Sequence, residues 1–295
     1  MKDYTRERTF NKIFGSLIGF AIGDAMGATT EFMTRDEIKS KYGQVKDIIG
    51  GGWLNLTPGE VTDDTQMMIA VADAYNASYL SQGTEHPLGF GEMCCRNFSI
   101  WYSSHPKDIG NACRRVISSC WGLSPDHWLD TAKQIDSEYP SLGNGGLMRC
   151  LYPALLGDES SAIYQGELTH ASSQSSTAIS LYTKILQRYL SSTETHAKRS
   201  VEKMDPEGKA HNSYVNAVYW SSMDSFESAI LGAVNDGGDA DTIAALTGGL
   251  AGARWGFNRI PKSWGLSLEE NTYLELRRLA ETATDILINK QEETL

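Results

Sequence analysis

The chain has 295 residues, of which 41% are hydrophobic, and its formal net charge is −11 at pH 7. The length fits one large domain or two small ones, and the negative charge argues against nucleic acid or an anionic membrane surface as a partner. The five cysteines lack CxxC spacing, so they predict reduced thiols in a cytoplasmic protein rather than a disulfide framework or a zinc site.

Helical spacing of apolar residues recurs along the chain, for example in 67–75 and 274–287, whereas strand-like alternation is rare. We therefore expect an all-α fold. No repeat period or interdomain linker stands out, so residues 1–295 are predicted to form one compact helical domain. The most apolar early run, 13–23, ends at Asp24 and is shorter than the ~20 residues that a bilayer span needs, so we expect no membrane partner.

Two rows of glycines are spaced by four residues. They are Gly15, Gly19, Gly23 and Gly27, and then Gly248, Gly252 and Gly256. Residues four apart share one face of a helix, and glycine in a helix interior costs up to ~1 kcal/mol relative to alanine. Such rows make sense if another backbone approaches closely, so we predict tight helix packing along them.

Acidic residues crowd at two predicted helix starts. In "VTDDTQMM" the polar residues are Thr62, Asp63 and Asp64, and in "NDGGDADT" the acids are Asp236, Asp239 and Asp241. Capping explains such residues, because Asp and Thr satisfy the first free N–H groups and acids complement the helix dipole. A divalent cation explains the crowding, because it would remove the repulsion between carboxylates, whose hard oxygens suit Mg²⁺ or Mn²⁺. On spacing alone both interpretations stay open.

Three further segments are polar or rich in glycine. "GDAMGATTE" carries Asp24 and Glu31 at the end of the first glycine row. "GNGGLMR", residues 143–149, is a turn of the kind that offers backbone N–H groups to a phosphate, although read alone a plain loop is the preferred interpretation. "THASSQSS" places His170 beside small polar residues, where a lone histidine is more often a structural hydrogen-bonding group.

Together these five segments resemble the motifs of the ADP-ribosylglycohydrolase family. G-D-x-x-G, T-D-D-T, G-N-G-x-x-M-R, a T-H segment and G-G-D-A-D-T occur in the family's order, between Thr9 and Gly256. Each motif is weak alone, but the ordered set is specific. The chain departs from the family at Ala244, where a glycine is common, and lacks the proline that often follows the T-H segment. The resemblance implies an all-α fold with two neighbouring Mg²⁺ or Mn²⁺ ions in a central cleft.

The resemblance also implies roles for individual residues. The implied metal ligands are Thr62, Asp63, Asp64, Asp239, Asp241 and Thr242. The implied ADP-ribose contacts are Gly143, Asn144, Gly145, Gly146 and His170, and Tyr139 is a looser match for an aromatic ring that stacks on adenine. Glu31, which follows the G-D-x-x-G motif, would lie beside the metals and the scissile bond.

The implied activity is hydrolysis of ADP-ribose from protein side chains, with arginine as the leading linkage. Cleavage of a ribosyl bond passes through an oxocarbenium-like state, and a carboxylate can activate the attacking water or stabilise the developing charge. Glu31 is the leading candidate, with Asp63 or Asp64 as the competing choice. Helix N-termini, the two metals and Arg149 are the expected sources of positive charge for the pyrophosphate.

"PKDIG" resembles the P-x-D-x-G segment of arginine-type bacterial members and contains Asp108. A carboxylate can accept two donors of a guanidinium in a fork, so Asp108 is a candidate for orienting the arginine as it leaves. The competing interpretation makes Asp108 the N-cap of the following helix.

Two alternative functions remain open. One is hydrolysis of another ADP-ribosyl linkage, to serine or in O-acetyl-ADP-ribose. The other is a non-catalytic protein that binds and neutralises an ADP-ribosyltransferase. The expected partners are accordingly an ADP-ribosylated protein substrate and, in the second case, a cognate transferase.

Overall fold

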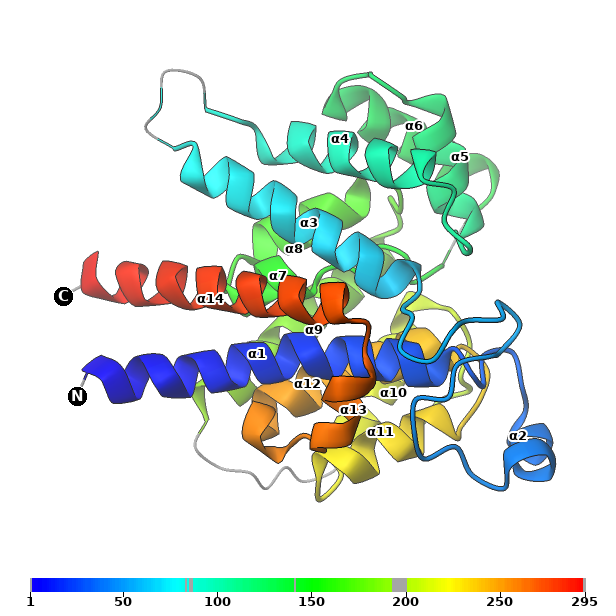
Figure 1. Cartoon of the computed structure of the whole chain (residues 1–295). Helices are drawn as coiled ribbons and strands as arrows, with labels where there is room; N and C mark the ends of the chain where they lie inside the picture. The colour runs from blue at the N-terminus through cyan, green and yellow to red at the C-terminus, as the bar shows by residue number, and fades with distance from the viewer. Residues whose placement is uncertain (1, 83, 85–86, 141, 193–200, 294–295) are drawn as a thin grey trace. The chain divides into compact units, whose positions relative to one another are not determined.

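Helices make up the fold, so the all-α prediction is confirmed (Figure 1). The computed structural model describes residues 2–82, 84, 87–140, 142–192 and 201–293. In chain order the helices are α1 (Lys2–Gly27), α2 (Arg35–Tyr42), α3 (Asp63–Leu80), α4 (Phe90–Ser103), α5 (Asn111–Ser119), α6 (Pro125–Glu138), α7 (Leu151–Leu155), α8 (Glu159–Glu167), α9 (Ser173–Ser191), α10 (Ala210–Ser221), α11 (Phe226–Val234), α12 (Ala240–Trp255), the 3₁₀ helix η1 (Phe257–Arg259), α13 (Lys262–Ser267) and α14 (Glu270–Glu293). β-structure in the described ranges consists of isolated bridges, Gly51 with Leu56 and Gly143 with Lys209.

The chain divides into two compact units. Unit 1 contains Met1–Thr62, Lys184–Gly208 and Asn212–Leu295, and unit 2 contains Asp63–Thr183 and Lys209–His211. That residues 1–295 form a single domain stays a prediction. None of the described helices is both long and apolar enough to cross a bilayer.

In unit 1, α1 packs against α12 on one side and α14 on the other (Figure 1). The two glycine rows meet in the α1–α12 contact, because a Cβ atom on Gly252 would lie 1.9 Å from the carbonyl oxygen of Gly15. A Cβ atom on Gly23 would lie 2.0 Å from the carbonyl oxygen of Ala244. Only a residue without a side chain fits such contacts, so the prediction of close backbone packing is confirmed.

The second glycine row differs from the prediction at both ends. Towards the start of α12 it continues as Ala244 and Ala240, which face Gly23 and Gly27. At the other end Gly256 lies beyond the helix with φ +77°, and its N–H caps the carbonyl of Gly252. Gly256 therefore ends α12 with a positive φ, while its backbone still contacts α1, because a Cβ atom on Gly15 would lie 2.7 Å from the carbonyl carbon of Gly256.

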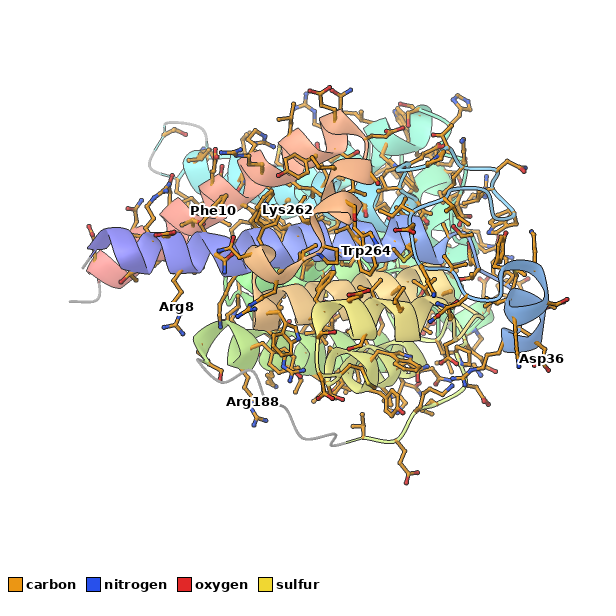
Figure 2. The ribbon with its side chains drawn as sticks, turned by 60° about the horizontal axis from the view of Figure 1, so that its bottom comes forward. Arg8, Phe10, Asp36, Arg188, Lys262 and Trp264 are labelled. Atoms are coloured by element: carbon orange, nitrogen blue, oxygen red, sulfur yellow. The ribbon has the colours of Figure 1, made fainter. Side chains whose placement is uncertain are left out.

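Charged and aromatic side chains of unit 1 lie in different surroundings. Arg8 and Arg188 point away from the helices, whereas Trp264 is turned towards them (Figure 2). Trp264 is buried against Phe226, and its indole N–H donates to Asp47 at 3.3 Å.

In unit 2, α3 packs against α4 and α7, and α5 packs against α6. Their apolar faces bury a core that includes Met67, Val71, Phe98, Val116 and Trp128. All five cysteines of the chain are buried and free. Burial raises the pKa of Cys95 and of Cys150 to about 12, so these thiols stay protonated and inert at neutral pH.

Candidate active site and metal centre

Three carboxylates converge in unit 1, namely those of Glu31, Asp239 and Asp241, whose oxygens lie within 4.8 Å of one another. Glu31 follows the end of α1, Asp239 precedes α12, and Asp241 lies in the first turn of α12. Glu31 and Asp241 are buried, and Asp239 is half-buried. The structure therefore brings these three residues together.

Backbone contacts explain why the two segments meet. The N–H of Phe32 donates to the carbonyl of Gly238 at 2.7 Å, and the N–H of Gly238 donates to the carbonyl of Met33 at 2.9 Å. The N–H of Asp239 donates to the carbonyl of Pro206 at 2.9 Å. Gly238 has φ +67°, and a Cβ atom there would lie 2.0 Å from the carbonyl oxygen of Pro206. The glycine next to Asp239 is thus required by the backbone.

The capping interpretation fails at Asp239. Asp239 occupies the N-cap position of α12, but its side chain makes no capping hydrogen bond. Asp241 accepts the N–H of Thr242 at 2.8 Å, and this bond orients the Asp241 carboxylate. Thr242 itself is the next residue in the sequence. Three mutually close carboxylates repel one another in a buried setting, so the donor set fits a hard divalent cation better than it fits helix capping.

Asp236, the third acid of the segment, does not belong to the triad. Its side chain is fully buried and accepts hydrogen bonds from Arg35 at 2.5 Å and from Lys203 at 2.8 Å. Two cations therefore neutralise Asp236 without a metal. These ion pairs also connect the loop before α12 to α2 and to the segment around residue 203.

Thr62, the last residue of unit 1, is held by Asp24. The Thr62 backbone N–H and hydroxyl donate to Asp24 Oδ1 at 3.1 and 2.7 Å. Asp24 thus fixes both the backbone and the hydroxyl of Thr62. Sequence reasoning noted Asp24 within G-D-x-x-G but gave it no function; its function in the structure is to orient Thr62.

The other predicted ligands, Asp63 and Asp64, begin α3 in unit 2 and are buried. That Asp63 and Asp64 bind the same metal ions as the triad of unit 1 stays a prediction.

The predicted ADP-ribose residues Gly145 and His170 lie together in unit 2. A Cβ atom on Gly145 would lie 2.5 Å from Cε1 of His170, so the histidine ring supports the G-N-G turn directly. Burial, with a smaller contribution from Arg149, lowers the pKa of His170 to about 3. His170 is therefore neutral at physiological pH and adds no positive charge.

The Thr169 hydroxyl connects His170 to Arg149. The Thr169 hydroxyl oxygen accepts from Arg149 at 2.8 Å and lies 2.8 Å from His170 Nδ1. The Thr169 hydroxyl thus links the imidazole to the buried guanidinium and orients the ring.

Arg149 corrects one expectation, that it supplies positive charge to the pyrophosphate. Its side chain is fully buried and donates to Gln165 at 2.7 Å and to Thr169, with its guanidinium over the ring of Phe98. A guanidinium that has no exposed surface and is hydrogen-bonded to buried partners cannot contact a nucleotide.

Two looser candidates lie on the surface of unit 2. Tyr139 ends α6 with 62% of its surface exposed, and the guanidinium of Arg115 lies 4.7 Å from its ring centroid. Asp108 does not cap the following helix, because α5 begins at Asn111 with Gly110 as its N-cap. Asp108 instead accepts the N–H of Ile109 at 2.7 Å, and burial raises its pKa.

Sequence reasoning missed the partner of Glu31. The indole N–H of Trp53 donates to Glu31 Oε2 at 2.5 Å. The only sequence signal for this loop is the run of three glycines at 50–52 that precedes Trp53.

The model of the family described as ADP-ribosylglycohydrolase matches residues 5–294. The chain belongs to the ADP-ribosylglycohydrolase family. The family is metal-dependent, and the triad of this member is a donor set that could hold a metal ion. The resemblance inferred from the five sequence motifs is thereby confirmed.

Two relatives and one solved structure are similar over most of their length. The chain is 34% identical over 290 residues to the ADP-ribosyl-[dinitrogen reductase] glycohydrolase of Rhodospirillum rubrum, covering 91% of this chain and 94% of that one. It is 30% identical over 292 residues to ADP-ribosylarginine hydrolase Tri1 of Serratia proteamaculans, covering 87% and 75%. A solved "ADP-ribosylglycohydrolase-related protein complex" matches with a TM-score of 0.74 at 25% identity, over 95% of this chain and 99% of that chain.

Proposed function

We propose that this protein is a metal-dependent hydrolase that removes ADP-ribose from modified arginine side chains of proteins. The observation that carries the proposal is the triad, in which Glu31 lies with Asp239 and Asp241 in a member of this family. Arginine is favoured over serine or O-acetyl-ADP-ribose because the Serratia relative is named for ADP-ribosylarginine. No observation favours a non-catalytic protein that occludes a transferase.

The proposed metal centre uses the oxygen-bearing residues of two helix starts. Its ligands are Thr62, Asp63, Asp64, Asp239, Asp241 and Thr242. Two Mg²⁺ or Mn²⁺ ions would supply Lewis acidity that orients the ribose hydroxyls and a water near the scissile bond.

The protein's own residues then provide the proton transfer and the orientation. Glu31, whose carboxylate is oriented by Trp53, takes a proton from the attacking water or stabilises the oxocarbenium-like state. Asp63 and Asp64 remain the competing carboxylates for this function. Asp108 accepts the guanidinium in a fork and orients the leaving arginine.

The ADP-ribose contacts are assigned to the G-N-G turn, residues 143–146, with its backbone N–H groups. His170 supports this turn with a neutral ring. Tyr139 is the proposed adenine platform, in which case the adenine would displace Arg115 from the ring or stack on its other face. The proposed setting is cytoplasmic.

One experiment tests the proposal and its alternatives. The purified protein is incubated with peptides that carry ADP-ribose on arginine or on serine, with Mg²⁺, with Mn²⁺ or with a chelator, and released ADP-ribose is measured. We expect metal-dependent release from the arginine peptide. Preferential release from the serine peptide would reject the arginine assignment, and binding without release from either would favour the non-catalytic alternative.

A further inference from the structure

Phe32, the residue after Glu31, has a strained backbone and an exposed side chain. Its φ is +61°, a left-handed conformation that bulky residues rarely adopt. Burial does not compensate for this strain, because 67% of the Phe32 surface is exposed. Strained backbone conformations cluster at functional sites. The exposed ring of Phe32 therefore requires an explanation.

Trp53 provides a second exposed ring beside Phe32. The ring centroids lie 5.4 Å apart with an interplanar angle of 48°, and 49% of the Trp53 surface is exposed. The indole projects from a short turn that the bridge between Gly51 and Leu56 closes. At the base of this turn the Thr29 hydroxyl donates to the carbonyl oxygen of Gly50 at 3.0 Å. The turn therefore fixes the backbone from which the indole projects, and the two rings lie close to each other.

The two rings border a cavity of about 550 Å³ that also includes Glu31 and, from α2, Glu37 and Lys41. Pockets that bind drug-sized molecules measure roughly 300–1,000 Å³, so the cavity accepts more than a single side chain. Two carboxylates on its wall disfavour the pyrophosphate of ADP-ribose. Exposed aromatic rings with charges of both signs nearby are instead typical of surfaces that bind polypeptides.

We propose that Phe32 and Trp53 form the surface on which the polypeptide flanking the modified arginine docks. This inference rests on the proposed function, and the cavity's continuity with Glu31 determines the occupant, because the flanking chain must lie next to the scissile bond. Trp53 additionally acts as a positioning residue, since its N–H holds the Glu31 carboxylate. Docking and positioning are therefore separable by substitution.

The test compares two substrates, an ADP-ribosylated peptide and free ADP-ribosyl-arginine, which lacks flanking chain. Phe32→Gly removes the ring and also the steric strain, because glycine adopts positive φ without a steric penalty, so its melting temperature should stay close to that of the wild type. We expect KM for the peptide to rise about fivefold or more. For free ADP-ribosyl-arginine we expect kcat/KM to stay within about twofold.

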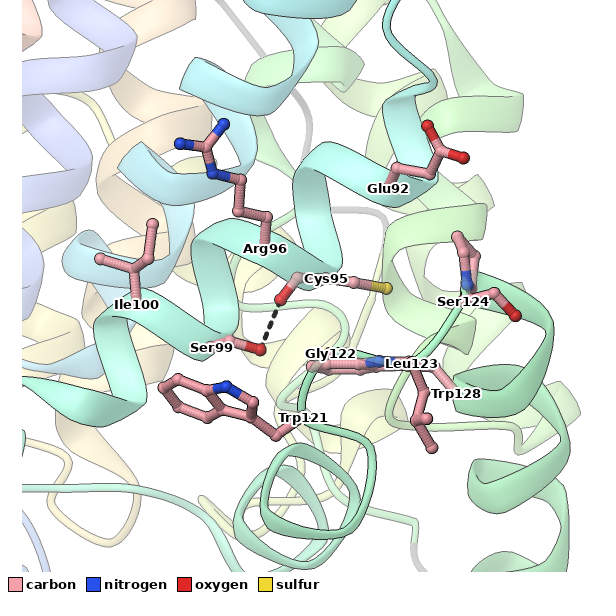
Figure 3. A pocket seen from close by; sticks show the side chains of 11 residues that line it. Glu92, Cys95, Arg96, Ser99, Ile100, Trp121, Gly122, Leu123, Ser124 and Trp128 are labelled. Atoms are coloured by element: carbon pink, nitrogen blue, oxygen red, sulfur yellow. Dashed lines mark hydrogen bonds between the residues drawn. The ribbon is translucent and has the colours of Figure 1, made fainter.

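Trp53→Phe separates the two functions of the indole, because it keeps a ring and removes the N–H. We expect kcat to fall on both substrates while KM for the peptide changes little. Trp121→Ala is the matched control: Trp121 is 54% exposed and lines a different cavity, of about 390 Å³ in unit 2 (Figure 3). It should leave all constants unchanged.

Three outcomes would overturn the inference. An unchanged peptide KM for Phe32→Gly would show that the ring contacts no flanking chain. An equal loss on both substrates would place Phe32 at the ADP-ribose or arginine end instead. If the wild type itself hydrolyses neither substrate, the proposed function fails and the docking surface fails with it, and this result is visible before any variant is made.

Discussion

A Cβ atom on Gly248 of α12 would lie 1.9 Å from the carbonyl oxygen of Gly19 on α1. No side chain fits between two backbones at that separation. Because Asp239 and Asp241 lie at the start of α12 and Glu31 follows the end of α1, this close packing also determines how near Glu31 comes to the two aspartates.

Gly19→Leu should therefore separate α1 from α12. Overpacking typically costs ~1–3 kcal/mol, and the obstacle here is backbone that cannot rotate away, so we expect the upper part of that range. Urea denaturation measures the loss. Gly110→Ser is the control, since nothing lies within 4 Å of a Cβ atom there and serine is favoured at an N-cap. Equal stability of both variants would contradict close packing as the reason for the glycine row.

Asp241→Asn should abolish metal-dependent stabilisation. A ligand that binds only the folded state raises the free energy of unfolding by ~2.7 kcal/mol at 100 times its dissociation constant, so Mn²⁺ should raise the melting temperature of the wild type but not of the variant. Asp130→Asn, at an exposed residue of α6, should respond like the wild type. A full Mn²⁺ response in Asp241→Asn would reject the metal centre.

Asp236→Asn should loosen the loop that carries Asp239. Breaking a fully buried ion pair costs ~3–5 kcal/mol; since the Arg35 and Lys203 side chains are 56% and 27% exposed, solvent screening reduces the expected loss to about 1–3 kcal/mol. We also expect weaker Mn²⁺ binding by calorimetry. Asp285→Asn breaks an exposed pair with Arg6 and should cost under ~1 kcal/mol. Unchanged Mn²⁺ affinity would mean that the ion pairs do not position the triad.

Asp108→Ala should depress turnover of ADP-ribosyl-arginine much more than it depresses ADP-ribose binding. Its side chain does not cap α5, so the melting temperature should change little. Because burial raises the pKa of Asp108, its carboxylate ionises at higher pH than an exposed one. If the ionised form is needed, wild-type turnover should fall as the pH is lowered through this pKa, and the variant should lack that part of the fall. A variant with wild-type turnover at every pH would remove Asp108 from the mechanism.

His170 should make the protein less stable in acid. Its pKa falls from 6.5 in the unfolded chain to about 3 in the fold, chiefly through burial. Between those values the unfolded state binds a proton that the folded state does not, so stability is full above pH 6.5 and falls by up to ~1.4 kcal/mol per pH unit towards pH 3. His170→Gln should flatten the dependence of unfolding free energy on pH between 6.5 and 4.5. An unchanged slope would mean that His170 is protonated in the fold.

Local patterns in the sequence were sufficient for the fold class and for much of the candidate site. Apolar residues at helical spacing predict helices because burial of one face follows directly from periodicity. Glycines four apart predict a close helix contact, and the clusters of acids at the starts of α3 and α12 can be read directly from the sequence. Motif order was enough to indicate the family.

Only the tertiary structure decided which interaction each polar side chain makes. Asp236 and Asp239 are three positions apart, yet Asp236 is neutralised by Arg35, 201 residues away, whereas Asp239 joins Glu31. Arg149 is consumed by buried partners, and the indole of Trp53 meets Glu31 across a turn of glycines. A side chain's charge and hydrogen-bonding capacity are properties of its residue type, but its partner depends on which distant segment helix packing brings within ~3 Å.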